Sequence, residues 1–137
     1  MKTIMKIAPI GMVLAVLSGS PAAATGTVEC TGADSADASV FLSVGRLPVL
    51  AVLGAVIEAE GTTYATDTDV NPDAEPIVFG QGFSDGDRLR ADFTDPNIEQ
   101  ILVSVRIERA FEDKAGAEAG IVRVAGRGAW PIVCVSG

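Results

Sequence analysis

Acidic and amide side chains occupy five alternate positions near the middle of the chain, a spacing that calcium loops use. The five are Asp67, Asp69, Asn71, Asp73 and Glu75. An EF-hand loop also needs a glycine at its sixth position and a bidentate glutamate at its twelfth. Those positions hold Pro72 and Val78. The sequence therefore predicts at most weak calcium binding, in a loop that is otherwise a solvated connection.

A second candidate site consists of arginines in two segments that alternate like strands. The four are Arg88, Arg90, Arg106 and Arg109. If the two strands are neighbours, these guanidinium groups form a cationic patch that can bind a carboxylate or sulfate through paired hydrogen bonds. The favoured interpretation is instead cross-strand pairing of the arginines with Asp92 and Glu108.

Known catalytic patterns are missing from this chain. It contains no histidine, which excludes Ser-His-Asp and Cys-His mechanisms and histidine-based zinc sites. Candidate glycosidase carboxylates exist, namely Asp85, Asp87, Asp92 and Asp95. Eighteen acidic residues guarantee such pairs by chance. The sequence favours a non-enzymatic binding, inhibitor or envelope accessory module without a cofactor; a small carboxylate-dependent hydrolase and a calcium-stabilised extracellular module are the alternatives.

The two cysteines, Cys30 and Cys134, lie near opposite ends of the chain. Only one intramolecular pairing is possible. There is no C-x-x-C spacing and no histidine to complete a metal site, so a structural disulfide is favoured over a redox or metal pair. Closing a loop of about 100 residues stabilises a fold by up to about 4.7 kcal/mol in the chain-entropy description.

The first 24 residues have the three parts of a secretory signal peptide. Lys2 and Lys6 supply the positive start, residues 7–17 are apolar, and residues 20–24 end in small side chains. The apolar run is too short to span a bilayer. We therefore divide the chain into a signal peptide, 1–24, and one periplasmic or secreted domain, 25–137, without a membrane span.

The elements that must position these residues are predicted to be strands. Short apolar stretches with period-two alternation recur about every 8–12 residues, separated by glycine, proline and aspartate. Residues 47–59 are predicted as a buried strand, with a short helix as the alternative, and 80–86 as a glycine-rich turn. The pattern predicts an all-β domain, a single antiparallel sandwich or small barrel of about eight short strands, with its terminal strands joined by the disulfide.

The clearest strand is 101–109. The predicted core residues are Ile101, Val103, Val105 and Ile107. Truncating a core residue of this strand should be costly. Arg106→Ala, at a position expected to be exposed, should cost within about 0.5 kcal/mol.

The charge of the chain limits its partners. Once the leader is removed, eighteen acidic residues face only eight basic ones. Such a surface repels phosphate backbones, so nucleic acid is a poor partner. The expected partner is a protein or a small molecule in the envelope.

Overall fold

The computed structural model describes residues 25–45 and 49–137, so the predicted signal peptide lies outside the described residues. All regular structure in these two segments is β. The ten strands are β1 (Thr25–Gly32), β2 (Ala38–Gly45), β3 (Ala51–Ala59), β4 (Thr62–Ala65), β5 (Glu75–Pro76), β6 (Val78–Ser84), β7 (Arg88–Thr94), β8 (Ile101–Glu112), β9 (Ala115–Val124) and β10 (Gly128–Ser136). The all-β prediction is confirmed, with ten strands rather than about eight and with a short parallel pairing of β4 with β5 in an otherwise antiparallel sheet.

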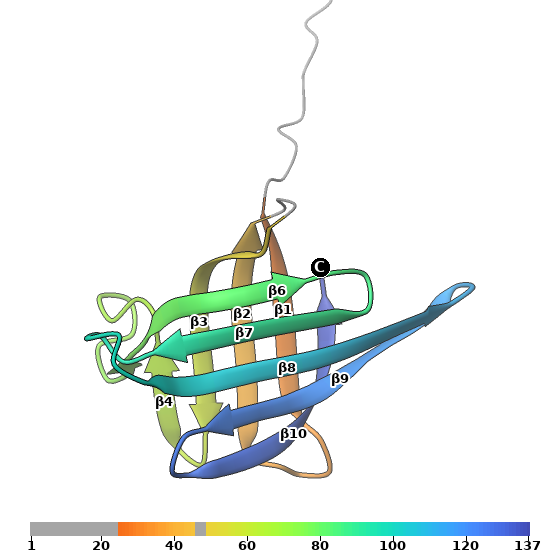
Figure 1. The fold of residues 1–137 in the computed structure, drawn as a ribbon. Coiled ribbons are helices and arrows are strands. Elements are labelled where there is room, and N and C mark those ends of the chain that lie inside the picture. The colour runs from red at the N-terminus through yellow and green to blue at the C-terminus, as the bar shows by residue number, and fades with distance from the viewer. Residues whose placement is uncertain (1–24, 46–48) are drawn as a thin grey trace, which may run out of the picture.

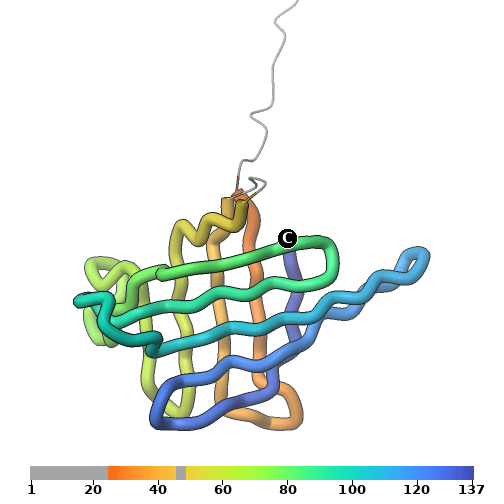
Figure 2. The backbone as a smooth tube through the Cα atoms, viewed as in Figure 1, coloured from red at the N-terminus to blue at the C-terminus, as the bar shows by residue number. Residues whose placement is uncertain are grey.

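All ten strands belong to one sheet, in the order β5-β4-β3-β2-β1-β10-β9-β8-β7-β6. Each half of the sheet, β1–β5 or β6–β10, pairs strands that follow one another along the chain. The antiparallel pairing of β1 with β10 joins the two halves. In Figure 1, β6–β9 cross in front of β1–β3 at a steep angle, so the sheet curls into a nearly closed, barrel-like shape. The backbone trace in Figure 2 shows the same two crossing layers.

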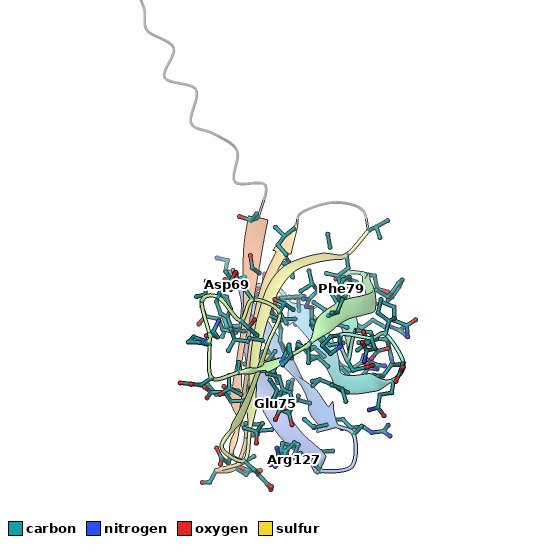
Figure 3. The ribbon with its side chains drawn as sticks, turned by 90° about the vertical axis from the view of Figure 1, so that its left-hand side faces the viewer. Asp69, Glu75, Phe79 and Arg127 are labelled. Carbon is teal, nitrogen blue, oxygen red and sulfur yellow. A yellow bond between two sulfur atoms is a disulfide. The ribbon has the colours of Figure 1, made fainter. Side chains whose placement is uncertain are left out.

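The core lies between the two crossing halves, where alternate side chains of each strand point inward. Leu42 and Ile57 from one half and Leu89, Phe93 and Ile107 from the other are each at most 1% exposed. Figure 3 shows side chains filling the space between the two layers.

The strand predicted at 101–109 is β8, but its first residue does not join the core. Val103, Val105 and Ile107 are fully buried, as predicted. Ile101 is 44% exposed, so the prediction is wrong at this position. The register between β7 and β8 shifts at Phe93 and Thr94, and this irregularity takes Ile101 out of the inward row.

Two further segments test the sequence analysis. Residues 51–59 form a strand, β3, rather than the alternative helix. The glycine-rich turn predicted at 80–86 is wrong over 80–84, because β6 continues to Ser84 with a bulge between Phe79 and Gln81; the chain turns only after Ser84, before β7 begins at Arg88. A Cβ on Gly80 would lie 3.0 Å from Thr94 Cγ2 and 3.3 Å from the carbonyl oxygen of Asp92. Gly80 therefore serves close strand packing rather than a turn.

The predicted disulfide between Cys30 and Cys134 is confirmed. The two cysteines lie directly opposite each other on β1 and β10, with Cα atoms 4.0 Å apart, and both are buried. A buried structural bridge is consistent with an oxidising compartment. Among the described residues, no helix is long and apolar enough to cross a membrane.

Truncating Ile107 to alanine should lower the free energy of unfolding by roughly 2 to 4 kcal/mol, through lost burial and a cavity. Ile101→Ala is the matched control, because it removes the same atoms from an exposed position and should cost about 1 kcal/mol or less. Urea unfolding of both variants measures the difference. Equal losses would contradict the register described here.

Replacing both Cys30 and Cys134 by alanine should lower the free energy of unfolding by about 2 to 5 kcal/mol. The bridge links residues 104 positions apart, so its removal frees the unfolded chain. The backbone pairs beside it remain, so circular dichroism should still report β structure. An unchanged denaturation midpoint would show that the bridge contributes no stability.

Candidate functional site

The outer surface of β6–β9 carries an ordered array of side chains, set by the register of the four strands. One row, from β6 to β9, is Phe83, Arg90, Arg106 and Ile121. The neighbouring row is Gln81, Asp92, Ser104 and Arg123. We call these eight residues the arginine face. They lie outside because the residues between them on β7, β8 and β9 fill the core.

Asp92 is the unusual member of the arginine face, because it points away from the core and is still only 5% exposed. Gln81 Nε2 donates a hydrogen bond of 2.8 Å to Asp92 Oδ2. Arg106 Nη1 lies 2.8 Å from Asp92 Oδ1, as an ion pair rather than a well-aligned hydrogen bond. Burial by itself would raise the pKa of Asp92, but the contacts with Arg106 and Gln81 outweigh it and hold the pKa below its ordinary value.

Arg106 binds the protein through one end of its guanidinium group. Besides Asp92, its Nη1 donates to the carbonyl oxygen of Val105 at 3.0 Å and to that of Ala91 at 3.5 Å. No residue of the described segments accepts a hydrogen bond from Nε or Nη2, and the side chain is 38% exposed. Arg106 is thus anchored, with donors left for a ligand.

Arg90 and Arg106 lie directly opposite each other on β7 and β8. Like charges at such positions repel. Arg90 Nη2 lies 3.4 Å from Glu108 Oε1, but both side chains are well exposed and such a pair stabilises little. Arg123, on β9, forms no ion pair with a carboxylate of the described chain. This face therefore concentrates positive charge on an acidic protein.

Two shallow hollows flank the Asp92–Arg106 pair. One, of about 260 Å³, is lined by Gln81, Gly82, Phe83, Arg90, Asp92 and Arg106. The other, of about 240 Å³, is lined by Asp92, Ile101, Leu102, Ser104, Arg106, Arg123 and Ala125. Each hollow combines guanidinium groups with an apolar wall. The arrangement can bind an oxyanion that carries an apolar group.

The structure divides the four arginines named from the sequence. Arg88, Arg90 and Arg106 share the outer surface of β7 and β8, and the predicted pairing with Asp92 and Glu108 is confirmed for Arg106 and Arg90 respectively. Arg88 Nε also lies 3.9 Å from Asp85 Oδ2. The side chain of Arg109 points to the opposite face of β8, the face that carries Val105 and Ile107, so it lies apart from the other three arginines.

The acidic loop follows β4 and supports its own turn. Asp67 Oδ1 accepts hydrogen bonds from the backbone N–H groups of Asp69 and Val70, at 3.0 and 3.2 Å. Asp69 and Glu75 lie apart in Figure 3. Within segments 25–45 and 49–137, no three histidine, cysteine or acidic side chains gather so as to hold a metal ion. Weak calcium binding at Asp67, Asp69, Asn71, Asp73 and Glu75 stays a prediction.

Five members of the arginine face were missed as site residues by the sequence analysis. They are Gln81, Phe83, Ser104, Ile121 and Arg123. Gln81 and Phe83 lie in the segment that was predicted to be a turn. The alternation seen in the strand from Arg88 onward does not reach them, because a turn separates the two strands. The others depend on a strand register that a single sequence does not reveal.

Comparisons with known proteins identify no relative. No family model, curated protein or solved structure matches this chain. The chemistry of its surface is therefore the basis for assigning a function.

Arg106→Ala should cost about 1 to 3 kcal/mol of stability, because it leaves a buried carboxylate without its cation. This revises the value expected for an exposed arginine. Arg90→Ala is the control and should be close to neutral. Urea unfolding at neutral pH compares them, and equal losses would contradict an anchoring role for Arg106.

The same pair predicts a pH dependence. The pKa of Asp92 is lower in the folded state than in the unfolded state. Its contribution to stability is therefore complete above the unfolded pKa and is lost as the pH falls through the folded pKa. Unfolding free energies measured across this acid range should fall less steeply in Asp92→Asn than in the unmodified protein.

Proposed function

We propose that this chain is a non-enzymatic, exported binding protein that holds an organic carboxylate or a similar oxyanion on its arginine face. The observation that carries the proposal is the opposed pair of Arg90 and Arg106, with guanidinium donors left over above a buried Asp92. An oxyanion placed between the two arginines would relieve their repulsion and accept their free hydrogen bonds.

The rest of the face supports an organic ligand rather than a bare ion. Phe83 is 52% exposed and Ile121 50% exposed, and they end the row that contains the two arginines. A ligand with a carboxylate and a flat apolar surface could cover either side chain while its charge meets the guanidinium groups. The acidic remainder of the protein would repel anions elsewhere, which favours capture at this one surface.

The carboxyl groups favour binding over hydrolysis. A carboxylic acid that donates a proton at neutral pH needs a raised pKa. The pKa of Asp85 is lowered by a backbone hydrogen bond from Asp87, and that of Asp95 by one from Gln100. The pKa of Asp92 is lowered as well. These three groups are shifted away from the direction a general acid requires.

Export belongs to the same proposal. Residues 1–24 act as a signal peptide that is removed, and the mature barrel-like domain works in the periplasm or outside the cell. The buried disulfide supports this location, because such bridges persist in oxidising compartments. The net acidic charge argues against nucleic acid as the ligand.

The test compares Arg90→Gln and Arg123→Gln with Lys114→Gln, which removes the same charge far from the face. Calorimetry at low ionic strength would use benzoate, oligogalacturonate and inorganic sulfate as probes. Each arginine variant should bind the best probe about tenfold more weakly, the loss of one charged hydrogen bond. Lys114→Gln should bind as the unmodified protein does, and all three should unfold at the same urea concentration.

The probes also separate the parts of the proposal. Benzoate binding more tightly than sulfate supports the apolar contact, oligogalacturonate binding more tightly than benzoate supports contact with several arginines, and added salt should weaken all three. The proposal fails if the unmodified protein binds none of the probes, or if Lys114→Gln weakens binding as much as Arg90→Gln.

A further inference from the structure

The hairpin of β8 and β9 extends beyond the rest of the sheet. Pairing of β8 with β7 ends at Glu108, and pairing of β9 with β10 ends at Glu118. Residues 110–117 therefore pair only with each other. We call them the arm; Figures 1 and 2 show it projecting from the body.

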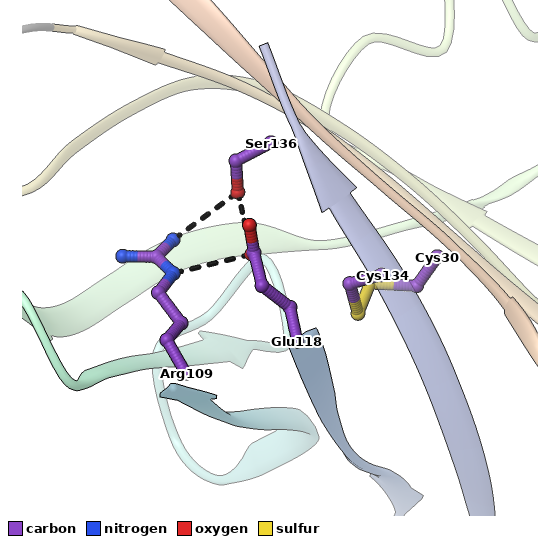
Figure 4. Close-up of a disulfide and its surroundings, with 5 residues drawn as sticks. All are labelled: Cys30, Arg109, Glu118, Cys134 and Ser136. Atoms are coloured by element: carbon purple, nitrogen blue, oxygen red, sulfur yellow. Dashed lines mark hydrogen bonds and ion pairs between the residues drawn. A yellow bond between two sulfur atoms is a disulfide. The ribbon is translucent and has the colours of Figure 1, made fainter. Parts of the chain in front are cut away.

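The root of the arm is held by a largely buried ion pair. Arg109 Nε lies 3.2 Å from Glu118 Oε2, and the two side chains are 13% and 10% exposed. Ser136 Oγ, on β10, donates to the same carboxylate oxygen at 2.7 Å and accepts from Arg109 Nη2 at 3.4 Å (Figure 4). These contacts tie the arm to the last strand and fix the direction in which it leaves the body.

The edges of the arm are unprotected. The backbone N–H of Arg109 donates to Asp87, on the β7 side. Hydrogen-bonding direction alternates along an antiparallel strand, so the backbone groups of Phe111 face the same side and those of Gly116 face the opposite edge. The edge strands of the sheet differ: β6 carries a bulge, and β5 has only two residues and ends in Pro76. Both devices prevent unwanted strand pairing, and the Ala-Gly-Ala edge at 115–117 has neither.

An apolar hollow of about 350 Å³ lies between this edge and β10. Its lining consists of Phe111, Gly116, Ala117, Glu118, Ala119, Val133, Cys134, Val135 and Ser136. Phe111 is 65% exposed and Val135 72% exposed. A Cβ on Gly116 would lie 2.4 Å from the ring of Phe111, so the ring packs directly over the glycine. An isolated two-stranded ribbon is marginally stable in water, and a third strand would cover both its alanine and glycine edge and this ring.

We propose that the arm docks an extended segment of another protein, which adds as a third strand along the Gly116 edge and places apolar side chains in the hollow. The free carboxylates nearby are Glu29, beside Val135, and Glu112 and Asp113 at the tip, against one cation, Lys114. Charge complementarity therefore predicts basic residues flanking the apolar positions of the segment. A second copy of this acidic chain fits less well. The proposal does not depend on the arginine face.

The test selects binders from a library of random linear eight-residue peptides on the immobilised mature protein. The matched variants are Phe111→Ala, an arm shortened by replacing residues 110–117 with a two-residue turn, and Val70→Ser, an exposed apolar change on the remote acidic loop. Selected peptides should alternate apolar residues between basic ends. They should bind Phe111→Ala at least about tenfold more weakly than the unmodified protein, which is the loss expected when one interface anchor is removed. Their affinity for Val70→Ser should be unchanged.

Hydrogen exchange gives a second readout, because an added strand should slow exchange of the Gly116 amide. A peptide with proline at its centre, which cannot complete the ladder, should not slow it. The proposal is overturned if no peptide is selected, if the shortened arm binds the selected peptides as well as the full arm, or if sedimentation shows that the arm instead joins two copies of this chain.

Discussion

The pairing of the first strand with the last is the interaction on which the rest of this structure depends. Each half of the chain pairs its consecutive strands, as hairpins except for the short parallel pairing of β4 with β5, and only β1–β10 joins the two halves into one sheet. Five backbone pairs and the Cys30–Cys134 bridge lie in this one strand pair. Without it, each half would expose the apolar surface that now faces the other half. The disulfide strengthens this contact, since it limits how far apart the chain ends can move in the unfolded state.

The last strand divides its length between two neighbours, and this division produces both the core and the arm. Residues 128–134 of β10 pair with β9, and residues 132–136 pair with β1. The turn of β10 from one layer to the other brings the two layers face to face. Because β10 leaves β9 at this point, the residues of β9 that precede Glu118 have no strand beside them on that edge. The arm and its open edge therefore follow from the same turn that joins the layers, and the Arg109–Glu118–Ser136 contacts mark the point of departure.

On the outer surface of β6–β9, the cost of burying a carboxylate is offset by its contacts with an arginine and an amide. A buried carboxylate on an outward position costs desolvation energy, and Arg106 and Gln81 compensate by meeting both of its oxygens. Arg106 is therefore held in place by several contacts, whereas its neighbour Arg90 is held only by its exposed ion pair with Glu108. Anchoring of this kind reduces the entropy lost when a ligand is bound. The proposed function depends on this fixed cation, which stands out on a protein with an excess of acids.

The sequence by itself determined the local features of this protein. Alternation of apolar and polar residues predicted the strands and the core positions Val103, Val105 and Ile107, because side chains of any strand alternate between two faces. Two cysteines allowed one bridge. Of the arginines named from the sequence, Arg88, Arg90 and Arg106 lie on the outer surface. Arg90 pairs with Glu108 and Arg106 with Asp92, as expected, whereas Arg88 lies beside Asp85. Tertiary structure alone decided which strands are neighbours and in what register. That register brought Gln81, Ser104 and Arg123 to the arginine face, withdrew Ile101 from the core and left residues 110–117 without outer partners. Such pairings join residues far apart in the chain through backbone hydrogen bonds, which every residue except proline can make, so they leave no local pattern to read.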